Sequence, residues 1–119
     1  MTWRYSQSTG ILYHNRTRIA KGYSGKGRSK NSGADEALRN QGPIPIGSYS
    51  IGIPYNSNKV GPYAIPLAPV GHSAHGRTAF LIHGDNSTST ASEGCIIISP
   101  QSIRRKIINS RDLKLDVVQ

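Results

Sequence analysis

The chain has 119 residues, with 15 Lys and Arg against 6 Asp and Glu, which gives a net charge of +9. This length fits one domain spanning residues 1–119, and the single Cys excludes an intramolecular disulfide framework. No apolar run approaches the roughly 18 residues of a membrane-spanning helix, so an integral membrane protein is excluded. The positive charge favours an acidic partner, either nucleic acid or an anionic polymer of the bacterial envelope.

The N-terminal region is predicted to form a hairpin. Trp3 and Tyr5 fall on one side of a strand, and the alternation resumes in residues 11–13 after a Ser-Thr-Gly turn at residues 8–10. Residues 15–17 have the composition of a second turn. The sequence therefore predicts short antiparallel strands at this end of the chain.

The middle of the chain is predicted to be rich in loops. Residues 22–33 carry almost nothing apolar and are expected to form an exposed loop, followed by a short helix over residues 34–38. The alternating residues 48–53 predict a strand. Residues 54–77 are rich in Pro, Gly and Asn, and we expect a long irregular crossing of the kind that often binds a ligand.

The C-terminal part contains two further predicted strands and one helix. Residues 79–82 form an apolar strand, and Leu and Val alternate with charged residues over positions 113–117. Ser99 as N-cap with Pro at the next position indicates a helix start. Ile103 and Ile107 would form its buried face, while residues 104–106 (Arg-Arg-Lys) would point to water. The predicted fold is mostly β, a compact sandwich or barrel with one or two short helices.

His83 and Cys95 are the residues most able to carry chemistry. His83 ends one apolar run and Cys95 begins the next, with a loop rich in Ser and Thr between them. If the two runs are neighbouring strands, both side chains emerge at the same edge of the sheet. An adjacent imidazole can raise the thiolate fraction of a Cys, whose free pKa is about 8.5. Gly94 would allow a tight turn that aims backbone N–H groups at a developing oxyanion.

Structural interpretations of the same residues stay open at this stage. A single Cys flanked by Ile is commonly a small buried apolar residue, and a His at a strand end commonly has no catalytic role. Their joint position at strand–loop junctions, with glycines beside both, favours a catalytic pair.

Several separated motifs resemble one enzyme family. The segments His83–Asp85 and Ser92–Ile96 resemble the active-site signature of cysteine L,D-transpeptidases, and most of all its short version in type VI secretion L,D-transpeptidase/L,D-carboxypeptidase effectors. Residues 42–51 are similar to the Gly-Pro-Ile-Pro-x-Gly-x-Tyr stretch of that branch, and Trp3–Gly10 and Gly22–Gly25 also resemble it. Glu occupies position 93, where the larger family usually has His, and the His–Cys interval is shorter; both features are shared with the effector branch.

The resemblance implies roles for individual residues. Cys95 would attack the bond between diaminopimelate and the terminal D-Ala of a peptidoglycan tetrapeptide stem, and His83 would take the thiol proton and pass it to the leaving amine. The resulting thioester would pass to water, to a D-amino acid or to another stem. Asp85 and Ser92 are candidates to orient His83. The catalytic set is then Cys95, His83, Ser92, Gly94 and Asp85. The residues expected to contact the substrate are Gly84, Glu93 and Tyr49, although Glu93 would equally suit an ion pair with a nearby cation.

The same resemblance implies partners and a place of action. We expect a monomer without cofactor or metal ion that binds peptidoglycan stem peptides and is matched by an immunity protein. Residues 1–6 lack the features of a secretory signal, so the protein would be made in the cytoplasm, exported by a specialised machine or carrier, and active in the periplasm of a target bacterium as an antibacterial toxin. The basic segments 21–30 and 104–106 would face the acidic polymer, or form a solvated surface.

Two alternatives compete with this hypothesis. A basic nucleic-acid-binding module without catalysis would use the +9 charge and the dispersed tyrosines. A zinc site would use His72, His75, His83 and Cys95, but the spacing matches no common zinc motif.

Overall fold

A computed structural model describes residues 2–88 and 90–119. The strands of these residues are β1 (Trp3–Ser6), β2 (Ile11–His14), β3 (Thr17–Lys21), β4 (Tyr23–Ser24), β5 (Gly47–Ile51), β6 (Tyr55–Ser57), β7 (Gly61–Val70), β8 (Phe80–His83), β9 (Ile96–Ile97) and β10 (Lys114–Val118). The α-helix is α1 (Gln101–Asn109), and single 3-10 turns lie at Gly27–Ser29, Gly33–Asp35 and Ala74–Gly76.

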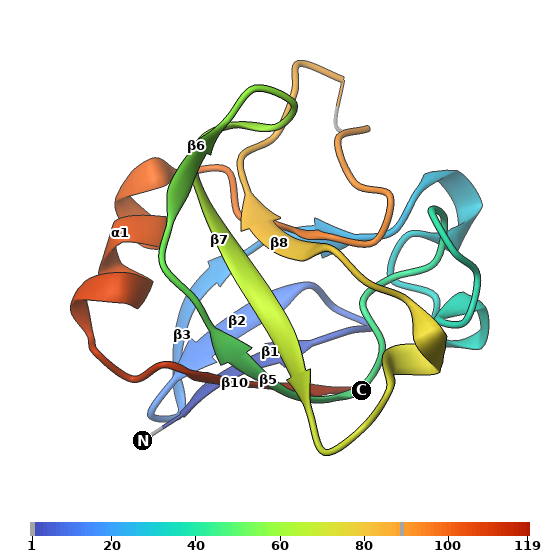
Figure 1. The fold of residues 1–119 in the computed structure, drawn as a ribbon, viewed down its shortest axis with the longest axis horizontal. Helices are drawn as coiled ribbons and strands as arrows, with labels where there is room; N and C mark the ends of the chain where they lie inside the picture. The colour runs from blue at the N-terminus through green and yellow to red at the C-terminus, as the bar shows by residue number, and fades with distance from the viewer. Residues whose placement is uncertain (1, 89) are drawn as a thin grey trace.

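The strands form one strongly curved sheet in the order β3-β2-β1-β10-β5-β7-β8-β9-β4, with β6 pairing to β7. Because β4 follows β3 in the chain after a single residue, the two ends of this order meet, and the sheet nearly closes into a barrel (Figure 1). The β1–β10 and β8–β9 pairs are parallel. The mostly β prediction is confirmed.

The predicted N-terminal hairpin, the strand at β5, the strand at β8 and the closing strand at β10 are all present. Strand alternation explains them, because one side of each strand enters the core. Trp3 and Tyr5 of β1 and Leu115 and Val117 of β10 are fully or almost fully buried. The predicted first residue of the closing strand, Leu113, lies outside β10 and is exposed.

Three predictions for the middle of the chain were wrong. Residues 22–33 are not simply an exposed loop, because β4 pairs with β9 and Ser24 and Ser29 are buried. The helix predicted over residues 34–38 is only a 3-10 turn at Gly33–Asp35. The supposed irregular crossing at residues 54–77 contains β6 and the ten-residue strand β7.

The prolines explain why β7 escaped prediction. Pro62, Pro66 and Pro69 all lie within this strand, although proline cannot donate to a ladder hydrogen bond. Successive residues of a strand direct their N–H groups to opposite neighbours, and β5, β6 and β8 each pair with only part of β7. Strand β7 therefore has positions whose N–H group no neighbouring strand needs as a donor, and proline can occupy such positions.

Helix α1 was predicted, but two of its details differ. It begins at Gln101, one residue later than expected, with Pro100 as N-cap and no side-chain cap hydrogen bond. Ile107 is buried and Ile103 packs against the core as expected. Arg104 is buried rather than directed to water, because it lies three residues before Ile107 and so shares the inner face of the helix. No helix of the described residues is long and apolar enough to cross a membrane.

Candidate active site

Strands β8 and β9 bring His83 and Cys95 together. Ile82 pairs in register with Ile96, and His83 with Ile97, in a parallel ladder. Side chains alternate between the two faces of a sheet, so Cys95, two residues before Ile97, is expected on the same face as His83. Both side chains line one pocket of about 400 Å³. The neighbouring strands predicted from the sequence are therefore present.

The imidazole of His83 is held by the backbone carbonyl of the next residue, Gly84. The side chain is 2% exposed, and its Nδ1 donates a hydrogen bond to the carbonyl oxygen of Gly84 over 2.8 Å. This tautomer leaves Nε2 with the free lone pair. Burial lowers the pKa of His83, and the charge of Arg104 acts in the same direction, against the opposing effects of the Gly84 hydrogen bond and the charge of Asp85. The resting imidazole is therefore neutral near pH 7.

Cys95 is half-buried and its thiol is protonated at rest. Its Sγ donates a weak hydrogen bond to the carbonyl oxygen of Ala79 over 3.7 Å. Burial raises the pKa of the Cys95 thiol, while a backbone hydrogen bond from Leu81 and the charges of Lys59 and Arg77 lower it in part. The direction is opposite to the higher thiolate fraction that the sequence suggested, because desolvation outweighs the neighbouring positive charges.

Ser92 organises the turn that presents Cys95. Its buried hydroxyl accepts hydrogen bonds from the N–H groups of Gly25 (2.9 Å) and Gly94 (3.1 Å), and donates one to the carbonyl oxygen of Cys95 (2.6 Å). Ser92 thus does not orient His83. The N–H of Gly94 itself is committed to Ser92, so any oxyanion donor in this turn would be another backbone N–H group.

Gly94 is required for a different reason. Its φ is +132°, and a Cβ at this position would stand 2.2 Å from Nη2 of Arg77. Glycine is the residue that tolerates both the backbone conformation and this close approach.

Arg77 is a site residue that the sequence analysis missed. It is buried and donates hydrogen bonds to the carbonyl oxygens of Glu36, Pro43 (2.9 Å), Gly42 (3.0 Å) and Glu93 (3.4 Å). It thereby ties the Gly-Pro-Ile-Pro segment to the loop before Cys95, and it lines the pocket. A single Arg in a polar segment gives no sequence signal for this role.

Arg104 is a second buried cation beside the pair. It donates to the carbonyl oxygens of Ile98 and Ser99, both at 2.8 Å, and to those of Tyr63 and Pro62. It also lies against the backbone next to His83, since a Cβ on Gly84 would stand 3.2 Å from its Nη1. Its position three residues before Ile107 on a short helix was the available signal.

The hydrogen bonds of Asp85 stabilise a neighbouring loop, and Asp85 acts on His83 only through its charge. Its carboxylate accepts hydrogen bonds from the Tyr23 hydroxyl (2.7 Å) and the Asn86 N–H (2.8 Å). Burial, together with the hydrogen bond to Asp85, raises the pKa of Tyr23 to about 12. Neither Asp85 nor Ser92 forms the hydrogen bond that orients the His83 ring. The carbonyl oxygen of Gly84 accepts that hydrogen bond instead.

The three residues expected to contact the substrate have different positions. Glu93 is exposed and lines the pocket, but Gly84 does not line it. Tyr49 is fully buried, packs edge-on against the rings of His72 and Phe80, and donates its hydroxyl to the carbonyl oxygen of Pro45. Tyr49 therefore supports the sheet and does not reach the pocket.

Charged residues missed by the sequence analysis complete the pocket wall. Lys59 lies in the turn between β6 and β7, and Arg39 lies on a loop before β5. With Arg77 they give the wall three positive charges against the single carboxylate of Glu93. The site therefore suits a ligand that carries negative charge.

A model of the Tlde1 domain family matches residues 18–118, which is most of the chain. The chain belongs to the Tlde1 domain family. Tlde1 domains are type VI secretion effector domains that act on peptidoglycan, in agreement with secretion into a target cell. No curated protein and no solved structure matches the chain.

The contacts of His72 and His75 give no support to the zinc alternative. His72 contacts the carbonyl oxygen of Ser48, and His75 forms an ion pair with Glu36. Within residues 2–88 and 90–119, no group of three or more His, Cys, Asp or Glu side chains is placed to hold a metal ion.

The two basic segments also differ from each other. In segment 21–30, Arg28 is exposed. In segment 104–106, Arg105 and Lys106 are exposed but Arg104 is buried. The cluster at residues 104–106 therefore offers two cations, not three, to an acidic polymer.

Proposed function

We propose that the protein is a cysteine enzyme that cleaves the bond to the terminal D-Ala of peptidoglycan tetrapeptide stems, as an L,D-carboxypeptidase, or exchanges that residue for a D-amino acid, as an L,D-transpeptidase. The observation that carries the proposal is that His83, the last residue of β8, and Cys95, the residue directly before the parallel strand β9, line one pocket. Membership of a family that acts on peptidoglycan supports the choice of substrate.

The protonation states favour a general-base mechanism. With a neutral thiol and a neutral imidazole at rest, Cys95 transfers its proton to Nε2 of His83 as Sγ attacks the scissile carbonyl carbon. A carbon–sulfur bond forms, and the carbon–nitrogen bond breaks as His83 returns the proton to the leaving amine of D-Ala. Attack of water or of an acceptor amine on the thioester then releases the thiol, with His83 again accepting and returning one proton.

The charges of the pocket fit the groups of a stem peptide. Lys59 and Arg39 suit carboxylates, which diaminopimelate and D-Ala both carry. Glu93 contributes the one carboxylate among the residues that line this pocket, and it suits the free ammonium group of diaminopimelate. This arrangement supports a zwitterionic peptide more than a uniformly anionic polymer such as nucleic acid.

The biological setting follows from the same proposal. Removal or exchange of D-Ala depletes the donor stems that normal cross-linking needs, so the protein would act as an antibacterial toxin in the periplasm of a target cell. An immunity protein in the producing cell and a carrier of the secretion machine are the expected protein partners.

The test uses purified tetrapeptide muropeptides, with and without an added D-amino acid, and follows D-Ala release and exchange by mass spectrometry. The wild-type protein should release or exchange D-Ala, Cys95→Ala should be inactive, and His83→Ala should lose about 10²–10⁴-fold in rate. His75→Ala is the matched control, since His75 is exposed and outside the pocket. Equal rates in the wild type, Cys95→Ala and His83→Ala would disprove the proposal.

A further inference from the structure

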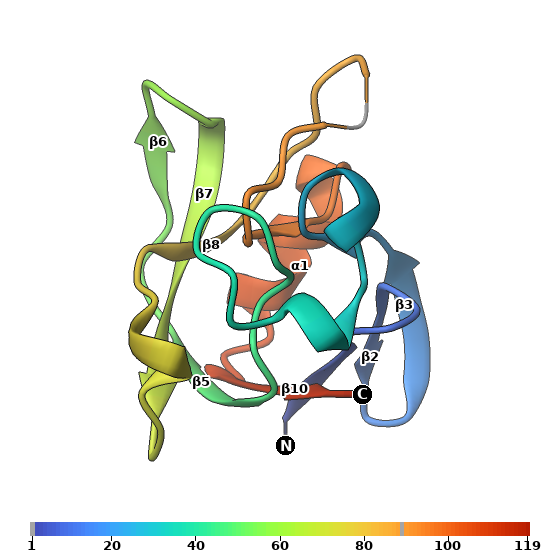
Figure 2. The ribbon, with the colours of Figure 1, turned by 90° about the vertical axis from the view of Figure 1, so that its right-hand side faces the viewer.

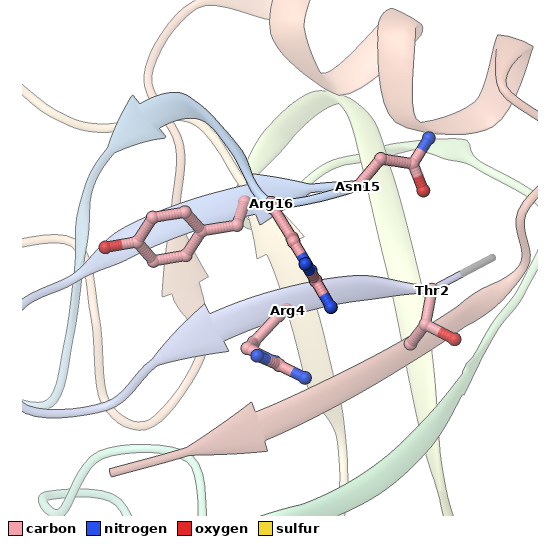
Figure 3. Close-up of a pocket in the computed structure, with 5 residues that line it drawn as sticks. Thr2, Arg4, Asn15 and Arg16 are labelled. Atoms are coloured by element: carbon pink, nitrogen blue, oxygen red, sulfur yellow. The ribbon is translucent and has the colours of Figure 1, made fainter.

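A second pocket lies on the outer side of the N-terminal strands. It has a volume of about 520 Å³ and is lined by Thr2, Arg4, Tyr13, Asn15 and Arg16. In Figure 3 the side chain of Arg16 extends from the hairpin turn toward β1, where Arg4 lies. Figure 2 shows β6 and the β2–β3 hairpin on opposite sides of the molecule, so this pocket is separate from the candidate active site.

The sheet register explains why Arg4 points outward. Its neighbours in β1, Trp3 and Tyr5, are buried in the core, so Arg4 lies on the other face. On that face it pairs with Tyr13 of β2 and with Asp116 of β10. The Asp116 carboxylate accepts a hydrogen bond from the Ser48 hydroxyl over 2.8 Å and forms no ion pair with Arg4.

The two guanidinium groups of the pocket are without a partner among the residues that the structure describes. Among residues 2–88 and 90–119, Arg4 and Arg16 form no ion pair, hydrogen bond or ring contact through their side chains. This contrasts with Arg77 and Arg104, whose guanidinium groups are each committed to four backbone carbonyls. Two converging cations are therefore available to a ligand.

Arg16 occupies a backbone position that favours glycine. His14 pairs with Thr17, so Asn15 and Arg16 form a two-residue hairpin turn, with φ of +51° and +68°. Turns with two positive φ values favour Asn followed by Gly, because a side chain at the second position is strained. Both turn residues line the pocket, and at the second position Arg16 keeps a guanidinium group there at the cost of a backbone conformation that glycine adopts more readily.

We propose that this pocket binds carboxylate groups of peptidoglycan stem peptides and anchors the protein to the polymer outside the active site. Arginine forms paired hydrogen bonds with a carboxylate, and Arg4 and Arg16 approach the same space from a strand and from a turn. The choice of polymer rests on the proposed function. Anchoring at a second point raises the local concentration of stems at Cys95 without any new contact in the catalytic pocket.

The first experiment measures binding to intact sacculi by co-sedimentation. Arg16→Gly removes one guanidinium group and also relieves the strained φ, so it should raise the midpoint of thermal unfolding by about 3 °C while weakening sacculus binding about fivefold. Arg4→Gln should weaken binding by a similar factor, and the double variant by more. Arg28→Gln is the control for the general effect of one lost positive charge, because Arg28 is exposed and lies in the basic segment 21–30 but does not line this pocket. Binding of Arg16→Gly or Arg4→Gln equal to that of Arg28→Gln would overturn the proposal.

The second experiment identifies the bound group and separates the two proposals. In this experiment the carboxylates of the sacculi are converted to amides. The wild-type protein should then bind these amidated sacculi only as weakly as the double variant binds native sacculi. If the double variant instead loses binding to anionic phospholipid vesicles but still binds sacculi as the wild type does, the pocket binds phosphate and the inference is overturned. Turnover of a soluble tetrapeptide should be unchanged in both single variants. A wild-type protein that binds sacculi through the pocket yet releases no D-Ala would refute the proposed function alone.

Discussion

Gly94→Ala should destabilise the protein strongly, because this position combines backbone strain with a steric clash. A non-glycine residue at φ +132° costs about 1–3 kcal/mol. The added Cβ would stand 2.2 Å from Nη2 of Arg77 and must displace the hydrogen bonds that this atom donates to the carbonyls of Gly42 and Glu93. Loss of charged hydrogen bonds of this kind adds about 1.5–3 kcal/mol each. Taking the lower end of each range, we expect a loss of at least about 4 kcal/mol in the free energy of unfolding.

A matched variant separates strain from clash. Gly71 has φ +80°, and a Cβ added there would meet no atom within 4 Å, so Gly71→Ala should cost only about 1–2 kcal/mol. With a urea dependence of about 1.5 kcal/mol per molar, the unfolding midpoint should fall by about 2.5 M for Gly94→Ala and by about 1 M for Gly71→Ala. In Arg77→Ala the clash is gone, so adding Gly94→Ala should then cost only the strain. Equal midpoints for the two single glycine variants would refute the reasoning.

Three other predictions concern the site. In the proposed mechanism the neutral imidazole accepts the thiol proton, so kcat/KM should fall with acid only below pH about 6.5. Arg104→Met should raise the pKa of His83 and move this acid limb to higher pH, whereas Arg104→Lys, which keeps the charge, should not. The lowered pKa of His83 also makes the free energy of unfolding fall as the pH drops below about 6.5, and His83→Gln should reduce that loss in urea unfolding at pH 5 and pH 7. Tyr49→Phe should cost about 1 kcal/mol of stability with KM unchanged; a raised KM at unchanged stability would show that Tyr49 contacts the substrate.

The parts of the fold that local patterns encode were predictable. Alternation located β1, β5, β8 and β10, since a strand with one buried face leaves a period of two in the sequence. The position of His83 and Cys95 at the junctions of two apolar runs was enough to place them at the ends of two neighbouring strands, His83 as the last residue of β8 and Cys95 directly before β9. Local patterns did not reveal β4, which has two residues and forms only because β9 offers it a partner.

The roles of the polar residues around the pair could not be predicted, because each depends on contacts distant in sequence. Ser92 receives the N–H of Gly25, and Arg77 reaches the carbonyl of Pro43. Asp85 has the charge to orient an imidazole, but Tyr23 occupies its carboxylate. Sequence spacing identifies which groups are near one another along the chain, whereas their hydrogen-bond partners are set by the closed sheet.

The two buried arginines act on opposite members of the proposed catalytic pair. Arg77 favours the thiolate of Cys95, whereas Arg104 disfavours the imidazolium of His83, and burial opposes the charged form of both. In the proposed mechanism, burial therefore disfavours both charges of the ion pair formed by proton transfer, and Arg77 offsets part of this effect at sulfur whereas Arg104 adds to it at nitrogen. Since a low pKa makes the imidazolium a strong acid, a proton taken from the thiol is readily given to the leaving amine. The same arginine that weakens His83 as a base therefore strengthens it as the acid of the next step.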